Sequence, residues 1–351
     1  MSACQLRRVY ACPIAARFRW VWWLFFAIPS IAIIVIVSLS VGPRYIPVAT
    51  LIEIFRSRDS SLTASFIVLD FRLPRTLLGL ICGAALGIAG ALMQAVTRNP
   101  LADPGILGVN AGAAFSMTLA ASVFSVQTID GYIWAALAGA VVVSLLVFVL
   151  AGGNRPGSSA AASPIRLVLA GVAVSAVLAG IGSSITLINP QAFDVMRVWA
   201  VGSLAGRDMH VVAAIAPFIA AGLAVALLVA PSLNATSLGE DLARSVGANI
   251  AFTYSLAVVA VTLLAGATTA AIGPIGFVGL MVPHAVRWLV GPDQRKIISL
   301  TMVAGPVLLL GADVLGRLIL RPGELEAGIV TAFVGAPVLI LLARRKQARG
   351  L

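Results

Sequence analysis

Long apolar runs that contain no charged residue recur along the whole chain. Two of them, "FIAAGLAVALLVA" (218–230) and "SLAVVAVTLLAGA" (255–267), flank a short polar stretch. A helix needs about 20 consecutive apolar residues to cross the hydrocarbon core of a bilayer. The sequence is 60% hydrophobic and 11% charged, whereas soluble domains carry roughly 25% charged residues. These runs exclude a soluble globular fold and predict an all-α, polytopic membrane protein.

Ten segments are candidate transmembrane helices by apolar length. They are residues 21–41, 76–97, 106–124, 132–151, 164–188, 210–230, 251–272, 274–290, 297–316 and 327–343. Four arginines precede the first segment, as in a secretory signal peptide, but its apolar run is longer than a signal core and no small-residue cleavage site closes it. We therefore expect an uncleaved first helix, a basic tail at 1–20, a membrane domain at 21–346 and a short tail at 347–351.

The positions of the basic residues predict how the chain is oriented. With both termini inside and the spans alternating, 15 of the 24 Lys and Arg residues and four of the 13 acidic residues lie on the inner side. The outer side then holds nine basic and nine acidic residues, so the whole formal charge of +11 is cytoplasmic. This is the bias that the positive-inside rule describes. Both termini are therefore expected in the cytoplasm, and the basic composition does not require a nucleic-acid partner.

Residues that could carry catalysis or bind a metal are few and scattered. Cys4, Cys12 and Cys82 offer neither a disulfide framework nor metal-ligand spacing. His210 and His284 are isolated, and no Gly-rich loop ends in the Gly-Lys-Ser or Gly-Lys-Thr that would hold a nucleotide phosphate. We expect no metal and no cofactor on this chain. We also expect no enzymatic activity, so any ATP hydrolysis would belong to another subunit.

The ten spans divide into two halves of five, at about 21–205 and 206–346. Because five is odd, a duplicated half would be inverted relative to its partner, as in many transporters. Each half holds an element interrupted by Gly and Pro, "TRNPLADPGILG" (97–108) and "AIGPIGFVGLMVPH" (271–284). A row of small residues at helical spacing, Gly79, Gly83, Gly87 and Gly90, predicts close helix packing rather than a ligand site.

The polar stretch "SLGEDLARSVGANI" (237–250) has the signals of a short helix. Ser237 and Glu240 form an S-x-x-E capping box, Asp241 adds negative charge to the first turn, and Gly247 suits the residue after the end. These signals predict two to three turns on the cytoplasmic side. A helix this short is marginal alone in water, so it either packs under its own bundle or docks on another protein. The residues alone do not decide between the two.

Four segments carry a resemblance to a known family. They are "FRLPRTLLGLICGAALGIAGALMQAVTRNPLADPGILGVNAG" (71–112), "SLGEDLARSVG" (237–247), "GPIGFVGLMVPHAVRWLVG" (273–291) and "PGELEAGIVTAFVGAPVLILLARRK" (322–346). They resemble the FecCD family of ABC importer permeases, which carry iron siderophores, haem or cobalamin. The resemblance runs from about residue 20 to 346. It implies a dimeric ten-helix bundle that sits on two ATPase subunits, which bind ATP and Mg²⁺, and receives its substrate from a periplasmic or lipid-anchored binding protein.

The resemblance also implies roles for individual residues. It identifies 237–247 as the helix that couples to the ATPase, with the residues Ser237, Leu238, Gly239, Glu240, Asp241, Leu242, Arg244 and Gly247. Family permeases use outer arginines to engage acidic residues of the binding protein, and Arg72, Arg75 and Arg317 match them. The alternatives are that Arg72 and Arg75 anchor a span at the interface and that Arg317 pairs with Asp313 four residues earlier.

The cytoplasmic gate and the substrate pathway are predicted from the same resemblance. Cobalamin-type members close the exit with adjacent hydroxyl residues, where this chain has Ser163, Pro164 and Ile165. An apolar constriction at Ile165 is therefore expected, although Pro164 could simply start a helix. The pathway is expected at the seam between two permease chains, with candidate lining residues Met93, Asn110 and Met196.

The expected substrate is a ferric siderophore, and "LINPQAFDVMRVWAVGSL" (187–204) is most similar to the permease subunits for ferric enterobactin, a catecholate. Haem and cobalamin stay open, because permeases for both share most of the motifs. An ion-coupled secondary transporter is a further alternative, but it would need charged residues in the middle of several spans. The second permease chain could be an identical or a different subunit. The expected location is a bacterial inner membrane, in contact with lipid.

Overall fold

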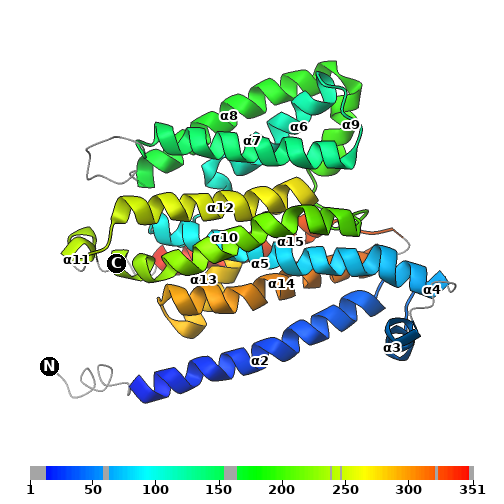
Figure 1. The fold of residues 1–351 in the computed structure, drawn as a ribbon, viewed down its shortest axis with the longest axis horizontal. Helices are drawn as coiled ribbons and strands as arrows, with labels where there is room; N and C mark the ends of the chain where they lie inside the picture. Colours follow the sequence, from blue (N-terminus) through cyan, green and yellow to red (C-terminus); the bar gives the residue numbers. More distant parts are fainter. Residues whose placement is uncertain are drawn as a thin grey trace.

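The structure is a computed structural model that describes residues 13–57, 63–153, 164–237, 239–245, 247–320 and 323–347 (Figure 1). These residues form helices joined by turns, and the described ranges contain no strand. Each of the ten predicted spans corresponds to one helix. They are α2 (Pro13–Ser40), α5 (Leu73–Val96), α6 (Val109–Ser122), α7 (Ile129–Leu150), α8 (Pro164–Ile188), α10 (Met209–Thr236), α12 (Ile250–Ile272), α13 (Val278–Val290), α14 (Gln294–Ile319) and α15 (Ala327–Gln347).

The apolar lengths agree with a membrane protein. Six helical stretches in the described residues are long and apolar enough to cross a bilayer, and three shorter apolar helices lie at Ala27–Ser40, Val278–Val290 and Ala327–Ile340. Two boundaries differ noticeably from the prediction. α2 already includes Pro13, the first described residue, which lies inside the segment expected to be a tail. α10 continues past 230 to Thr236, since a helix that leaves the hydrocarbon core can become polar without ending.

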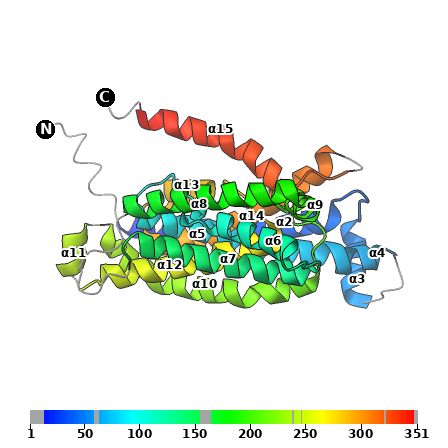
Figure 2. The ribbon, with the colours of Figure 1, turned by 90° about the horizontal axis from the view of Figure 1, so that it is seen from above.

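Short helices connect the long ones. α3 (Val48–Ser57), α4 (Thr63–Phe66) and the π-helical turn η1 (Ile67–Arg72) lie between α2 and α5. The 3-10 turn η2 (Pro104–Leu107) precedes α6, α9 (Pro190–Trp199) follows α8, and α11 (Glu240–Ser245) lies between α10 and α12. The start of α2, the end of α15 and α11 lie at one end of the bundle, whereas α3, α4 and α9 lie at the other (Figures 1 and 2). We call these the α11 end and the α9 end.

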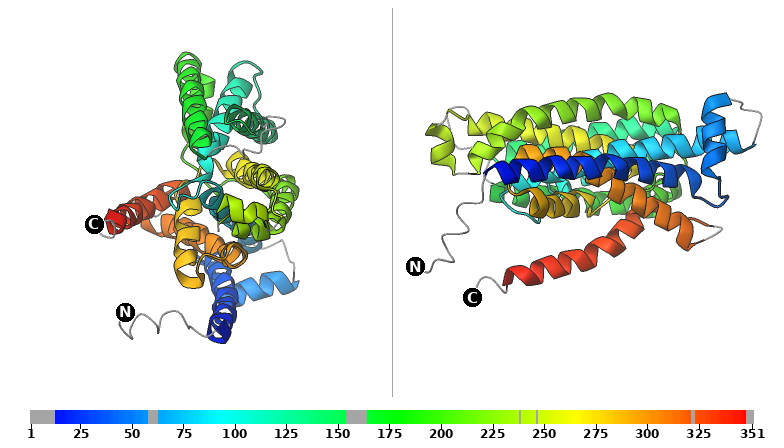
Figure 3. Two further views of the ribbon diagram at one scale, coloured as in Figure 1. Left: turned by 90° about the vertical axis from the view of Figure 1, so that its left-hand side faces the viewer. Right: turned by 90° about the horizontal axis from the view of Figure 1, so that it is seen from below.

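The glycine row on α5 lets its neighbours approach closely, as predicted. A Cβ on Gly79 would lie 2.2 Å from Leu310 on α14, and one on Gly83 would lie 2.7 Å from the backbone of Pro306. One on Gly90 would lie 1.7 Å from the carbonyl oxygen of Gly279, at the start of α13. α5 is consequently buried along most of its length. It forms the centre of the bundle together with α12 and α14 (Figure 3).

The two halves repeat one packing pattern in opposite directions. α5 packs on α14 and α13, and α12 packs in the same way on α7 and α6. The short helices α6 and α13 both start from a residue in the left-handed region, Gly108 (φ 73°) and Phe277 (φ 67°). α2 begins at the α11 end and α10 begins at the α9 end, so the halves are inverted (Figure 1). The first helices break the symmetry, because α10 packs on α12 while α2 packs mainly on α14.

Candidate functional site

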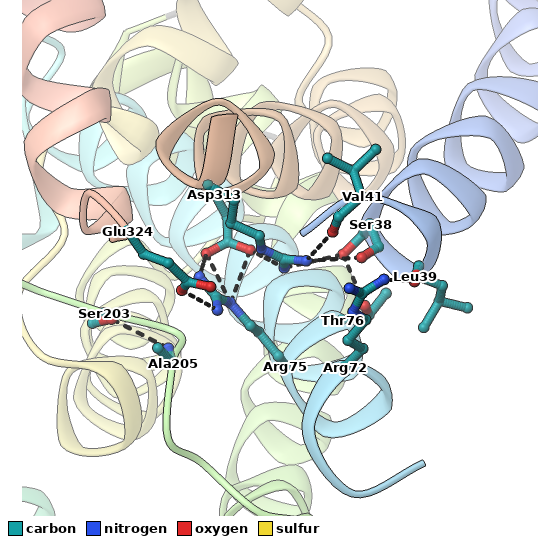
Figure 4. Close-up of polar contacts among 11 residues, drawn as sticks. Ser38, Leu39, Val41, Arg72, Arg75, Thr76, Ser203, Ala205, Asp313 and Glu324 are labelled. Atoms are coloured by element: carbon teal, nitrogen blue, oxygen red, sulfur yellow. Dashed lines mark hydrogen bonds and ion pairs between the residues drawn. The ribbon is translucent and has the colours of Figure 1, made fainter. Parts of the chain in front are cut away.

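A buried cluster of charges joins four segments at the α9 end (Figure 4). Arg75 donates from Nε to both carboxylate oxygens of Asp313 at 3.1 Å, and from Nη2 to Oδ1 at 2.7 Å. Its Nη1 donates to Glu324 Oε2 at 2.6 Å. Arg317, one turn after Asp313 on α14, donates from Nη2 to Asp313 Oδ2. The Asp313 side chain is fully buried, so its charge depends on these two guanidinium groups.

Arg72 and Arg317 cap the end of α2. The last carbonyl groups of a helix have no partner within it. Arg317 Nη1 donates to the Ser38 carbonyl at 2.8 Å, and Arg72 Nη1 donates to the carbonyls of Leu39 at 2.6 Å and Ser40 at 2.9 Å. Positive charge at this position also interacts favourably with the helix dipole. The two arginines therefore fix the end of α2 against α5 and α14.

The arrangement places two of the three arginines predicted for docking in contacts within the chain. Arg72 is 6% exposed and Arg317 is 1% exposed, and their acceptors all belong to this chain. Neither guanidinium is therefore available to a binding protein in this structure. The alternative for Arg317, a pair with Asp313, is what the structure contains. Arg75 retains a partly accessible side chain, 12% exposed, beside Glu324, which is 30% exposed.

At the opposite end, α11 differs from the predicted helix in its start and length. It covers Glu240–Ser245, less than two turns. The predicted capping box is wrong, because Ser237 ends α10 and its hydroxyl donates to the Asn234 carbonyl at 2.7 Å. Gly247 does close the helix: it has φ 83°, and its N–H donates to Arg244 O at 3.0 Å while Ala248 N–H donates to Ala243 O at 2.9 Å. These two bonds are a Schellman motif.

α11 presents polar and apolar side chains to its surroundings. Ala243 is fully buried, whereas Leu242 is 60% exposed and Asp241 and Arg244 are exposed. Gly239 has φ 110° and starts the helix. Leu238 and Val246 lie outside the described residues, and of Glu240 only the backbone is described. An exposed leucine between two exposed charges is a composition that fits a groove on another protein.

The base of α11 is attached to two other segments. Asn234, near the end of α10, donates from Nδ2 to Asp293 Oδ1 at 2.8 Å and accepts from Gln294 N–H at 2.7 Å. Asp293 is the N-cap of α14. Arg98, just after α5, donates to Thr236 O at 3.3 Å. The segment that carries α11 is thereby tied to the α11-end termini of both α5 and α14.

α5 and α14 connect the two ends of the molecule. The charge cluster contains Arg75 from the first turn of α5 and Asp313 and Arg317 from the last turns of α14. Their other ends lie at the anchors of α11, and between the ends their backbones meet at Gly83 and Gly305. A movement of α11 would be passed to the charge cluster through α5 and α14, because these two helices are closely packed.

The predicted gate residues lie at the start of α8. Ser163 lies outside the described residues, and Pro164 is the first described residue of α8. Ile165 is 71% exposed. Further apolar side chains along α8 are also exposed, namely Leu169, Val172, Val177 and Ile181. This unpartnered apolar surface faces either lipid or another chain.

The predicted pathway residues fall in three different environments. Met93 is fully buried in the core, because the glycine row brings α13 and α14 over that part of α5. Asn110 accepts a hydrogen bond from Thr269 Oγ1 at 2.9 Å and links α6 to α12. Met196 lines a cavity of about 300 Å³ between α6, α8 and α9. The structure does not bring these three residues together.

Several residues of the two sites were not predicted. Glu324 and the α2 carbonyls complete the charge cluster, and Asn234 and Asp293 complete the anchor of α11. Asp313 was predicted only as an alternative partner of Arg317 and not as a partner of Arg75. A buried aspartate within an apolar span was the one available signal, since such a residue requires a counter-charge. The described residues hold no group of three or more His, Cys, Asp or Glu side chains that could bind a metal.

Comparison with known proteins gives consistent results. Residues 30–345 match the FecCD transport family. The chain is 47% identical over 329 residues to the ferric enterobactin transport system permease protein FepD of Escherichia coli, covering 92% of this chain and 96% of FepD. It is 37% identical over 289 residues to the cobalamin import system permease protein BtuC of Halobacterium salinarum, covering 82% of this chain and 76% of BtuC.

A solved structure shows the same architecture. An inward-facing metal-chelate type ABC transporter aligns with a TM-score of 0.79 at 27% identity, over 93% of this chain and 99% of that one. The resemblance that the sequence motifs indicated is confirmed, and the chain belongs to the FecCD transport family.

Proposed function

We propose that this chain is the transmembrane permease subunit of an ATP-driven ABC importer that carries a ferric siderophore, of the catecholate type, across a bacterial inner membrane. The observation that carries the proposal is the 47% identity to the E. coli ferric enterobactin permease over nearly the whole of both chains. Substrate pathways of permeases are built from the membrane helices, so similarity over the entire membrane domain supports a related substrate.

Two alternatives are weaker. A cobalamin or haem permease would share the family fold, but the cobalamin relative is 37% identical against 47% for the enterobactin relative. A secondary transporter would carry ionisable residues midway along its helices. Among the described residues, the fully buried charged side chains are Arg72, Asp313 and Arg317, and all three lie at the α9 end.

ATP hydrolysis belongs in this proposal to two separate ATPase subunits, and α11 is the element that contacts them. The exposed Leu242, Asp241 and Arg244 support this role, and the anchors at Asn234 and Arg98 would pass movement of α11 to α14 and α5. The α11 end is then cytoplasmic. The positive-inside rule favours the same orientation.

A substrate-loaded binding protein docks at the α9 end. Arg75 and Glu324 are the partly accessible members of the charge cluster and are the residues we assign to this contact. Arg72 and Arg317 support it indirectly by holding α2 beneath the cluster. Because the binding protein and the ATPases bias the same conformational equilibrium from opposite ends, their binding is thermodynamically coupled.

A second permease chain covers the exposed apolar face of α8, and the substrate passes along the seam between them. The gate lies where α8 begins, at Pro164 and Ile165, with Ser163 just before it. The 71% exposed Ile165 would contribute an apolar constriction rather than a hydroxyl gate. Asn110 and Met196 stay candidates for the pathway.

The test is transport by the purified assembly in proteoliposomes with a loaded binding protein. We expect uptake of radioactive iron from ferric enterobactin to require ATP and to exceed uptake of cobalamin. Uptake that continues without ATP would contradict an ABC importer, and preferential uptake of cobalamin would contradict the substrate assignment.

The double variant Glu240→Ala/Arg244→Ala should abolish stimulation of ATP hydrolysis by the binding protein without dissociating the complex. Arg56→Ala, on an exposed residue of α3 at the other end, is the matched control.

A further inference from the structure

A cavity of about 330 Å³ lies at the α9 end between α6, α7, α9 and α12. Its wall is mostly apolar, with side chains such as Met117, Ile133 and Val198. Its polar groups include Asp194, Trp199 and Arg207. Ligand sites in proteins typically have this composition, an apolar wall with a few convergent polar groups.

Arg207 brings a partly buried positive charge to this cavity. Its Nε atom is buried without a hydrogen-bond partner, and the guanidinium has no hydrogen bond or ion pair with any other described residue. Burial lowers the pKa of Arg207 from its ordinary value, and the charge of the adjacent Asp208 opposes that effect only in part. Partial removal of a charge from water is unfavourable unless another charge offsets it. An anion in the cavity would therefore stabilise the Arg207 guanidinium further.

The neighbouring carboxylates each have another partner as well. Asp208 accepts a hydrogen bond from Val211 N–H at 3.1 Å as the N-cap of α10. Asp194 is 3.7 Å from the guanidinium of Arg197. Asp130, at the start of α7, lies 3.0 Å from Nδ1 of His210.

Trp199 supplies a second donor without an acceptor. Its side chain is only 6% exposed, and its indole Nε1 is buried and makes no hydrogen bond in the described structure. An indole N–H is a donor only, and both Trp199 and Arg207 belong to the wall of the cavity. Both residues belong to a well-anchored segment, because Ser203 N–H donates to Ile272 O at 2.8 Å and Gly328 N–H donates to Gly202 O at 3.0 Å.

We propose that this cavity binds a planar aromatic anion, of the carboxylate or catecholate class, with Arg207 as the counter-ion and the Trp199 indole N–H as a second donor. A guanidinium presents a planar fork of donors that matches two oxygen atoms on one face of a ring. The apolar wall would contact the ring itself. The cavity has room for one such ring system, so it takes a free aromatic acid or one arm of a larger ligand.

The link to transport rests on the proposed function. A ferric catecholate siderophore presents aromatic rings that carry negatively charged oxygens, so the cavity would hold one of its arms at the α9 end before translocation. This would be a recognition site within the permease itself, separate from the charge cluster around Asp313.

The experiment measures equilibrium binding of benzoate and of benzamide to the full chain in nanodiscs of uncharged lipid, by calorimetry. Benzamide has the same shape without the charge. We expect benzoate to bind at least about tenfold more tightly than benzamide, because hydrogen bonds to charged groups contribute on that order. Equal affinities for benzoate and benzamide, or no binding of benzoate, would overturn the proposal. This measurement uses the wild-type chain and needs no variant.

Variants assign the binding to Arg207. Arg207→Gln should remove the preference for benzoate, whereas Arg56→Gln, which deletes an equal charge from an exposed residue at the same end, should change the affinity less than about twofold. Trp199→Phe should weaken benzoate binding several-fold and keep the aromatic wall. Unchanged benzoate affinity in folded Arg207→Gln would overturn the assignment.

Competition separates the two sources of the anion. Ferric enterobactin that displaces benzoate from the wild-type chain supports a siderophore arm as the natural occupant, and failure to displace it restricts the cavity to free aromatic acids. This binding is measured without ATP, ATPase or binding protein. A chain that binds benzoate through Arg207 but does not import ferric siderophore would therefore disprove the proposed function and leave the anion site intact.

Discussion

Arg75 and Asp313 are 238 positions apart in the chain, yet three hydrogen bonds of 2.7 to 3.1 Å join their side chains at the α9 end. Because Arg75 lies in the first turn of α5 and Asp313 near the end of α14, the contact closes one end of the pair of helices that runs through the centre of the bundle. It links the surface proposed for the binding protein to the helices that reach the anchors of α11.

Removal of the buried carboxylate should destabilise the fold strongly. Asp313→Ala leaves Arg75 and Arg317 without their shared counter-charge, so we expect the free energy of unfolding to fall by about 3–5 kcal/mol. The measurement is unfolding of the chain in mixed micelles with increasing denaturing detergent. Asp194→Ala removes a carboxylate that is 69% exposed in a pair at 3.7 Å, and it should cost about 1 kcal/mol or less. Similar losses in the two variants would show that the cluster contributes little.

Contact between α5 and α14 depends on the absence of a side chain at Gly305. A Cβ there would lie 2.1 Å from the carbonyl oxygen of Gly83, which is backbone and cannot rotate away. Gly305→Ala should therefore separate the helices and cost about 1–3 kcal/mol in unfolding free energy.

Gly311 is the control for this prediction. It lies on the same helix, and a Cβ there would meet nothing within 4 Å. Gly311→Ala should be neutral or more stable by up to about 1 kcal/mol, because alanine has the higher helix propensity. A Gly305→Ala chain that unfolds at the same detergent concentration as Gly311→Ala would contradict the close approach.

The left-handed conformation of Gly247 should be required to end α11. At φ 83° a Cβ would meet no neighbouring atom, so the cost of Gly247→Ala comes from the backbone and should be about 1–2 kcal/mol. We expect faster amide hydrogen exchange in α11 and weaker stimulation of ATP hydrolysis by the loaded binding protein. Gly247→Asn should preserve both, because asparagine tolerates this conformation. If Gly247→Ala and Gly247→Asn show the same hydrogen exchange in α11 and the same stimulation of ATP hydrolysis, the left-handed conformation of Gly247 is not required for coupling.

The membrane helices were predictable from the sequence because a bilayer imposes a minimum apolar length on every span. The glycine row on α5 was predictable for a similar reason, since small residues at helical spacing have few uses other than close packing. Capping signals in the sequence gave a wrong prediction where one residue could belong to either of two successive helices. Ser237 fits an N-cap by residue type, but α10 continues to Thr236 and uses Ser237 at its own end.

Apart from the pair of Asp313 and Arg317, the charge cluster could not be predicted, because its partners are remote in sequence. Arg72 reaches carbonyl groups that lie 32 to 33 positions earlier, and Arg317 reaches a carbonyl 279 positions earlier. A lone arginine near a span boundary is compatible with docking, with a lipid contact and with capping of another helix. Only the packing of α2 against α5 and α14 decides among them.

Asn234 offers the most direct test of coupling through α14. Its side chain bonds Asp293 at 2.8 Å and the N–H of Gln294 at 2.7 Å, so Asn234→Ala frees α11 from the start of α14. Two lost hydrogen bonds should cost about 1–2 kcal/mol, which leaves a folded complex. If α14 carries the signal, this variant should keep basal ATP hydrolysis and lose most of its stimulation by the binding protein. Ser255→Ala removes a hydroxyl that bonds within α12, to Ala251 O at 2.9 Å, and should change neither rate. Full stimulation in Asn234→Ala would exclude this anchor from the coupling path.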